Sequence, residues 1–129
     1  MGLDTTHGCW NGPYSSFSVF RTLIAASMGF DLSEMEGFCA RGKKWSELPE
    51  SDIYILLNHS DCDGEISTNE TVKLLDAMVD HRDKFINFKG TARNRNGVHC
   101  VSQFMIQHYD AWISGLKRAI KLDEKVEFF

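Results

Sequence analysis

The chain lacks long apolar runs, paired cysteines and a leader-like N-terminus. No stretch of its 129 residues approaches the ~18 apolar residues that a membrane-spanning helix needs. The four cysteines form no Cys-x-x-Cys pair, so a zinc site built from cysteine pairs is not indicated. The N-terminus has no basic stretch followed by an apolar one, as a signal peptide would. We therefore expect a cytoplasmic protein that makes no membrane contact and keeps its thiols free.

An excess of basic residues is also missing. The chain has 14 Lys and Arg against 18 Asp and Glu, which gives a formal net charge of −4. This balance argues against general nucleic-acid binding. The composition, 43% hydrophobic and 25% charged, is typical of a globular protein. We expect residues 1–129 to form a single domain, and the oligomeric state stays open.

Helical periodicity dominates the remaining pattern. Phe17, Phe20, Ile24 and Met28 follow one another at steps of three or four, which predicts a helix over about 14–28. Similar patterns indicate helices near 51–57, 67–85 and 98–121. Residues 1–13 are broken by glycine and predict irregular structure, residues 89–97 predict a loop, and residues 126–129 favour an extended tail. The expected fold is mostly α, with about four main helices and an irregular N-terminal segment.

One segment carries a specific motif, with Gly64 as the sixth residue of a twelve-residue loop over 59–70. This loop resembles an EF-hand calcium loop. The resemblance implies an EF-hand-like helix–loop–helix corner that holds Ca²⁺. It implies carboxylate ligands from the third and fifth positions, a backbone carbonyl from the seventh, a water-mediated contact from the ninth and a bidentate glutamate at the twelfth. These positions are Asp61, Asp63, Glu65, Ser67 and Glu70.

The loop departs from the EF-hand pattern in two ways. His59 stands first, where the family has aspartate, and imidazole suits Zn²⁺ better than Ca²⁺. Zinc is therefore the alternative metal. The chain also has no second loop of this kind, although EF-hands usually occur in pairs. A corner without metal is the competing interpretation, in which Ser67 and Glu70 cap the following helix.

A metal-dependent hydrolase is a further alternative. It requires the N-terminal segment to fold across the corner, so that His7 joins His59, Asp61 and Asp63 around one metal with an open position for water. The sequence shows no such proximity, and we expect the protein not to be an enzyme.

Positive charge gathers before the last predicted helix, in contrast to the rest of the chain. Lys89, Arg93 and Arg95 stand there among glycine and asparagine. Guanidinium groups bind phosphate through paired hydrogen bonds, so this loop is a candidate site for a nucleotide-like ligand.

Three short segments also resemble small uncharacterised proteins encoded by bacteriophages and prophages. They are MGLDTTH at residues 1–7, residues 58–66, and VEFF at residues 126–129. The resemblance implies an accessory protein in the cytoplasm of a bacterial host. The leading hypothesis is a non-enzymatic binding protein ordered by the calcium loop. The alternative is an anti-defence inhibitor that captures a host protein or a nucleotide-like signal through the basic loop.

Overall fold

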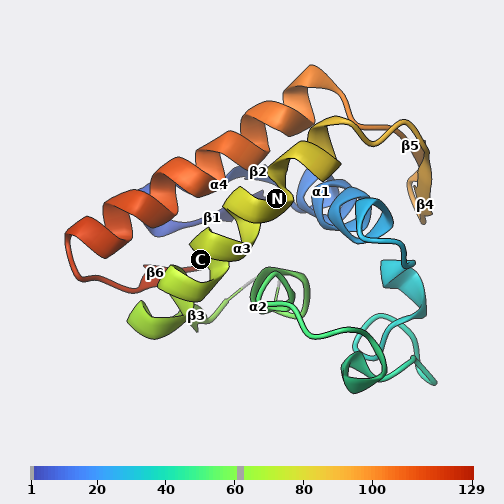
Figure 1. The fold of residues 1–129 in the computed structure, drawn as a ribbon, viewed down its shortest axis with the longest axis horizontal. Helices are drawn as coiled ribbons and strands as arrows, with labels where there is room; N and C mark the ends of the chain where they lie inside the picture. The colour runs from blue at the N-terminus through green and yellow to red at the C-terminus, as the bar shows by residue number, and fades with distance from the viewer. Residues whose placement is uncertain (1, 61–62) are drawn as a thin grey trace.

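Helices make up most of the protein, as the computed structural model shows for residues 2–60 and 63–129 (Figure 1). The helices are α1 (Tyr14–Ser27), α2 (Tyr54–Leu57), α3 (Thr68–Ile86) and α4 (Gln103–Lys121), and 3-10 turns occur at η1 (Thr6–Gly8), η2 (Leu32–Glu34) and η3 (Trp45–Glu47). Three antiparallel strand pairs join them: β1 (Gly2–Asp4) with β2 (Asn11–Pro13), β3 (Glu65–Ile66) with β6 (Val126–Glu127), and β4 (Ala92–Asn94) with β5 (Gly97–His99). The mostly helical prediction is confirmed, but strands are present as well.

Helix α1 lies at the centre of the core. Its apolar residues Phe17, Phe20, Leu23 and Ile24 are fully buried, as their spacing predicts. The helix contacts α3 and α2, the β1–β2 pair, η2 and β4. Helices α3 and α4 run alongside each other over it, and β4–β5 lies at the far end of the molecule from β6 (Figure 1).

The N-terminal segment is more regular than its glycines predict. It forms the β1–β2 hairpin around η1, because Trp10 is drawn into the core. The Trp10 ring lies 5.1 Å from the ring of Phe17 and stacks on His108 at 4.1 Å. The Thr5 hydroxyl accepts a hydrogen bond from the Trp10 backbone N–H at 2.8 Å, which fixes the turn. The prediction of irregular structure over 1–13 is therefore wrong for both strands.

The C-terminal tail is extended, as predicted, and β6 pairs with β3. The Phe128 backbone N–H donates to the carbonyl of Gly64 at 2.9 Å, and Thr5 forms a β-bridge with Phe128. The tail therefore lies between the N-terminal segment and the segment that leads into α3.

The boundaries of the long helices follow their caps. The Ser67 hydroxyl accepts from the Glu70 N–H, and the Glu70 carboxylate accepts from the Ser67 N–H, so α3 begins where it was predicted. Helix α4 begins at Gln103 rather than near residue 98, because residues 97–99 pair in β5 and Ser102 supplies the cap. The two helices are joined by a bidentate pair between Arg82 and Asp110, which holds the pKa of Asp110 below its usual range.

The predicted loop over 89–97 is wrong as well, because most of it belongs to the β4–β5 hairpin. Asn94 pairs with Gly97 across a two-residue turn. Gly97 takes a φ of 120°, a conformation that glycine adopts readily. The Asn96-Gly97 dipeptide, which is typical of hairpin turns, is the local signal for this hairpin in the sequence.

Close packing of α4 on the N-terminal segment depends on Gly115. A Cβ atom at this position would collide with the Cys9 sulfur and approach the Cys9 backbone nitrogen to 2.9 Å. We expect Gly115→Ala to lower the free energy of unfolding by about 1–3 kcal/mol, as overpacking does in buried sites. Urea denaturation measures it, with the exposed neighbour Ser114→Ala as control. Equal stability of the two variants would show that this contact is not tight.

Candidate functional site

The predicted metal loop uses several of its residues for structure. The carboxylate of Glu65 forms an ion pair with the Lys125 ammonium at 2.8 Å, and Glu70 and Ser67 form the cap of α3. The two ring nitrogens of His59 lie within 3.0 Å of the carbonyl oxygens of Ser60 and Glu65. Gly64 has a φ of 98°, which permits the sharp turn that the motif requires.

Part of the metal prediction falls outside the described residues. Asp61 is not among them, whereas the Asp63 carboxylate accepts from the Ser60 hydroxyl at 3.0 Å. Glu65, Ser67 and Glu70 do share one hollow of about 550 Å³, but Lys125 lines it too. Helix α2 is only one turn long, so the EF-hand-like corner is not established. Calcium or zinc binding by this loop stays a prediction, which calorimetric titration of wild type and Asp63→Ala tests.

The residues proposed for a hydrolase have separate partners. His7 bonds to the Thr6 hydroxyl at 2.8 Å and to Glu124 at 3.0 Å, whereas His59 stacks on Phe128 at 4.1 Å. The C-terminal tail lies between the two segments that carry these histidines. Over residues 2–60 and 63–129, no group of three or more His, Cys, Asp or Glu side chains is placed to hold a metal ion.

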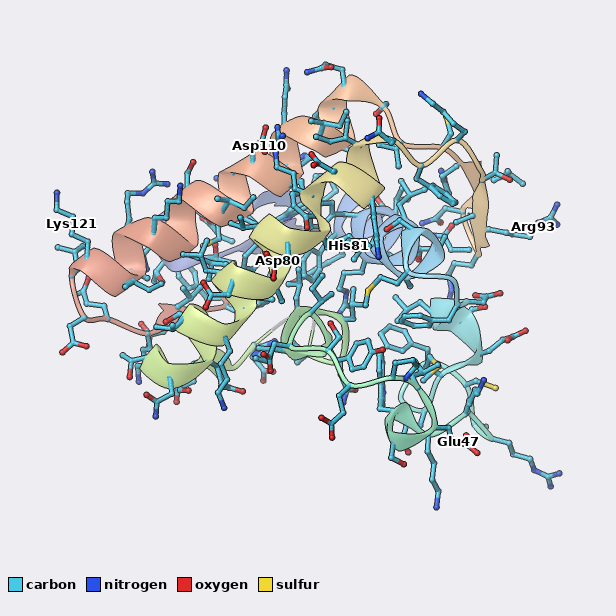
Figure 2. All side chains as sticks on the ribbon, in the orientation of Figure 1. Glu47, Asp80, His81, Arg93, Asp110 and Lys121 are labelled. Atoms are coloured by element: carbon cyan, nitrogen blue, oxygen red, sulfur yellow. The ribbon has the colours of Figure 1, made fainter. Side chains whose placement is uncertain are left out.

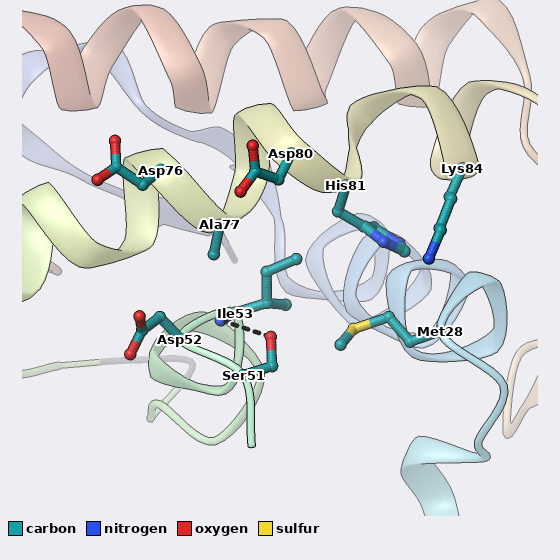
Figure 3. Close-up of a pocket in the computed structure, with 9 residues that line it drawn as sticks. All are labelled: Met28, Ser51, Asp52, Ile53, Asp76, Ala77, Asp80, His81 and Lys84. Atoms are coloured by element: carbon teal, nitrogen blue, oxygen red, sulfur yellow. Dashed lines mark hydrogen bonds between the residues drawn. The ribbon is translucent and has the colours of Figure 1, made fainter. Parts of the chain in front are cut away.

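An acidic hollow of about 400 Å³ lies between α3 and the segment before α2 (Figure 3). Asp76 and Asp80 border it from α3, and Asp52 borders it from the opposite side. His81 lies at one end, with its Nε2 2.7 Å from the Ser27 hydroxyl. The Ser27 hydroxyl donates its proton to the Ile24 carbonyl and therefore accepts a hydrogen bond from His81. His81 is thus not placed to take a proton from Ser27, as a general base would be. The arrangement matches the acidic character of the chain as a whole and does not indicate catalysis.

The hairpin groove is the more specific candidate. We give this name to two hollows that share Thr22 and lie between α1, the η2 segment and the β4–β5 hairpin. The first has a volume of about 400 Å³ and is lined by Thr22, Ala26, Gly29, Phe30, Asp31, Phe88, Thr91, Ala92 and Arg93. The second, of about 260 Å³, is lined by Ser18, Thr22, Leu32, Ser33, Phe38, Asn94 and Arg95. Small side chains one turn apart on α1, at Ser18, Thr22 and Ala26, form its floor.

Charge distinguishes this groove from the rest of the protein. Residues 84–109 contain two lysines and two arginines but no aspartate or glutamate, and residues 5–30 contain no acid either. Within the part of the chain that the structure describes, neither Arg93 nor Arg95 forms an ion pair or a side-chain hydrogen bond. Figure 2 shows Arg93 extending from β4 away from the body of the molecule. Two guanidinium groups are therefore available to an anion.

Asn94 fixes the hairpin against the groove floor. Its Oδ1 accepts from the Asn96 backbone N–H at 2.8 Å and from His99 Nε2 at 2.9 Å. Its amide donates to the Ser18 hydroxyl at 3.3 Å, which ties β4 to α1. These bonds fix the hairpin that carries both arginines, and they do not involve either guanidinium group.

Of the three residues predicted to hold a nucleotide-like ligand, two line the groove. Arg93 belongs to the first hollow and Arg95 to the second, whereas Lys89 lines neither. Thr22, Phe30, Phe38 and Phe88 also line the groove, and no motif in the sequence marks them as binding residues. The small-residue spacing of Ser18, Thr22 and Ala26, opposite the apolar stripe of α1, is a signal that would have indicated an accessible face.

Comparisons with known proteins find no match for this chain among family models, curated protein sequences or solved structures. None of the helices over the described residues is long and apolar enough to cross a membrane.

Two histidines, the buried His81 and the half-buried His108, predict a dependence of stability on pH. Burial, followed by the charge of Lys84, lowers the pKa of His81, and burial lowers the pKa of His108. The unfolded chain therefore takes up these protons first as the pH falls. We expect the free energy of unfolding to be highest above about pH 6.5 and to decline toward about pH 5.

Urea denaturation at several pH values measures this decline. The double variant His81→Gln/His108→Gln should reduce it, because both titrating groups are gone. A decline of the same size in the double variant would contradict the assignment to these two histidines.

Proposed function

We propose that the protein is a non-enzymatic binding protein that holds a nucleotide-like ligand in the hairpin groove. One observation carries the proposal: two arginines that have no side-chain partner among the described residues flank hollows that also contain phenyl rings. A guanidinium donates paired, charge-assisted hydrogen bonds to phosphate oxygens. Aromatic rings provide surfaces on which bases stack. The groove therefore combines the two kinds of contact that a nucleotide offers.

The two walls of the groove differ in charge, which orients the ligand. Asp31 lines the first hollow from the η2 side, and its Oδ1 accepts hydrogen bonds from both the N–H and the hydroxyl of Ser33. This carboxylate repels phosphate, whereas Arg93 on the hairpin attracts it. Phosphate therefore lies against the hairpin, and the base lies toward Phe30.

The lining residues support binding without turnover. Neither hollow is lined by a histidine or a cysteine from the described residues, and the Asp31 carboxylate in the first hollow is bonded to the N–H and hydroxyl of Ser33. A protein that holds a nucleotide without converting it removes that nucleotide from other binders. This agrees with a sequestering role in an infected bacterium, as the resemblance to phage proteins implies.

Adenosine 5′-monophosphate (AMP) is a direct probe. We expect AMP to raise the melting temperature of the wild type, because a ligand that binds only the folded state stabilises it. The double variant Arg93→Gln/Arg95→Gln should lose this effect. Lys117→Gln on α4 removes one exposed positive charge elsewhere and should keep it. AMP stabilisation that persists in the double variant would show that the groove is not the site.

Asn94→Ala tests, in the same experiment, whether AMP binding needs the fixed position of the hairpin as well as its positive charge. It keeps both guanidinium groups but removes the bonds that fix the hairpin. We expect weaker AMP binding at an unchanged net charge, whereas Asn96→Ala, whose side chain makes no hydrogen bond in the described part of the chain, should bind like the wild type. Equal AMP affinity of the two variants would show that binding depends on the positive charge alone and not on the position of the hairpin.

A further inference from the structure

We propose that the ligand of the hairpin groove is a dinucleotide that carries two phosphates, with one nucleotide unit in each hollow. The inference rests on the proposed function and names its substrate class. Each of the two hollows is lined by one arginine and by at least one phenylalanine. The first hollow combines Arg93 with Phe30 and Phe88, and the second combines Arg95 with Phe38.

The junction between the two hollows has the chemistry of a phosphodiester contact. Thr22 lines both hollows and makes no side-chain hydrogen bond among the described residues, and its hydroxyl is not among the polar atoms that are sealed from water without a partner. A hydroxyl that is open to a hollow can donate a hydrogen bond to an oxygen of a bound ligand. The oxygen of a linking phosphate accepts a hydrogen bond from such a group.

The two arginines are placed for two separate phosphates. They stand two residues apart, Arg93 on β4 and Arg95 in the turn, and Asn94 between them is bonded to Ser18 on the groove floor. Arg93 lines the first hollow and Arg95 lines the second, so the two guanidinium groups belong to different hollows. The same wall of the groove supplies both positive charges, so the backbone of the ligand follows the hairpin.

The opposite wall receives the bases. Phe30 also packs edge-on against Trp45 at 5.9 Å and Tyr54 at 6.0 Å, which holds its ring in place for stacking. Phe38, at 39% exposed, is accessible at the second hollow. The two hollows have volumes of about 400 and 260 Å³, and we assign one nucleotide unit to each.

Calorimetric titration with AMP, the linear dinucleotide pApA and a pentamer of the same repeat tests the inference. We expect pApA to bind the wild type about tenfold more tightly than AMP, because the second unit binds at a high effective concentration. AMP should occupy the larger first hollow. Arg95→Gln should therefore weaken pApA about tenfold and leave AMP unchanged, whereas Arg93→Gln should weaken both.

Two further variants sharpen the test. Thr22→Val keeps the side-chain shape but removes the hydroxyl, and it should weaken pApA several-fold without affecting AMP. The melting temperature of Thr22→Val shows whether this variant folds. If it does not fold, the inference is tested with Arg95→Gln, because residue 95 is exposed. Lys117→Gln should bind all three probes like the wild type.

The outcomes separate this inference from the proposed function. Equal affinity for pApA and AMP, or an unchanged pApA affinity in Arg95→Gln, would overturn the dinucleotide while leaving a nucleotide site in place. A pentamer that binds tenfold more tightly than pApA would overturn it in favour of a single-stranded nucleic acid. Binding of neither AMP nor pApA would overturn both proposals.

Discussion

The burial of α1 is the constraint on which the rest of the structure depends. Its aromatic side is covered by Trp10 and by α3, so Phe17 and Phe20 lose nearly all contact with water. Transfer of such rings from water is the main favourable contribution to folding. Because α1 is fixed by this side, its opposite side, with Ser18 and Thr22, is presented to the hairpin and forms the groove floor. Core and candidate site are thus two sides of one helix.

A buried cation connects this helix to the first residue of the predicted metal loop. Arg21 is 3% exposed, and its guanidinium donates to the carbonyl of His59 at 2.6 Å. The same group lies over the Phe17 ring at 4.6 Å. Position 21 thus uses its charge to hold the chain after α2, whereas the guanidiniums of Arg93 and Arg95 remain available. The contrast shows why burial and bonding, and not residue type alone, identify candidate binding residues.

The sequence predicted the long helices well, because their apolar residues repeat with the helical period and Ser67 marks one start. It did not predict the β4–β5 hairpin, since three-residue strands carry no clear alternation. The sequence indicated only some of the residues that line the groove. Arg93 and Arg95 stood out by charge, but Thr22 lies about seventy residues earlier, and only packing brings it beside them. At the metal loop, local spacing alone could not distinguish a calcium ligand from a helix cap, and Glu70 acts as a cap here.

Mapping of AMP contacts by two-dimensional amide NMR tests the central claim most directly, because it locates the ligand without any substitution. We expect titration with AMP to shift the amide signals of residues 18–31 and 88–97, and to leave unchanged those of residues 63–70 and of residues 51–53 and 76–81, which border the acidic hollow. Shifts confined to the loop before α3 or to the acidic hollow would contradict it.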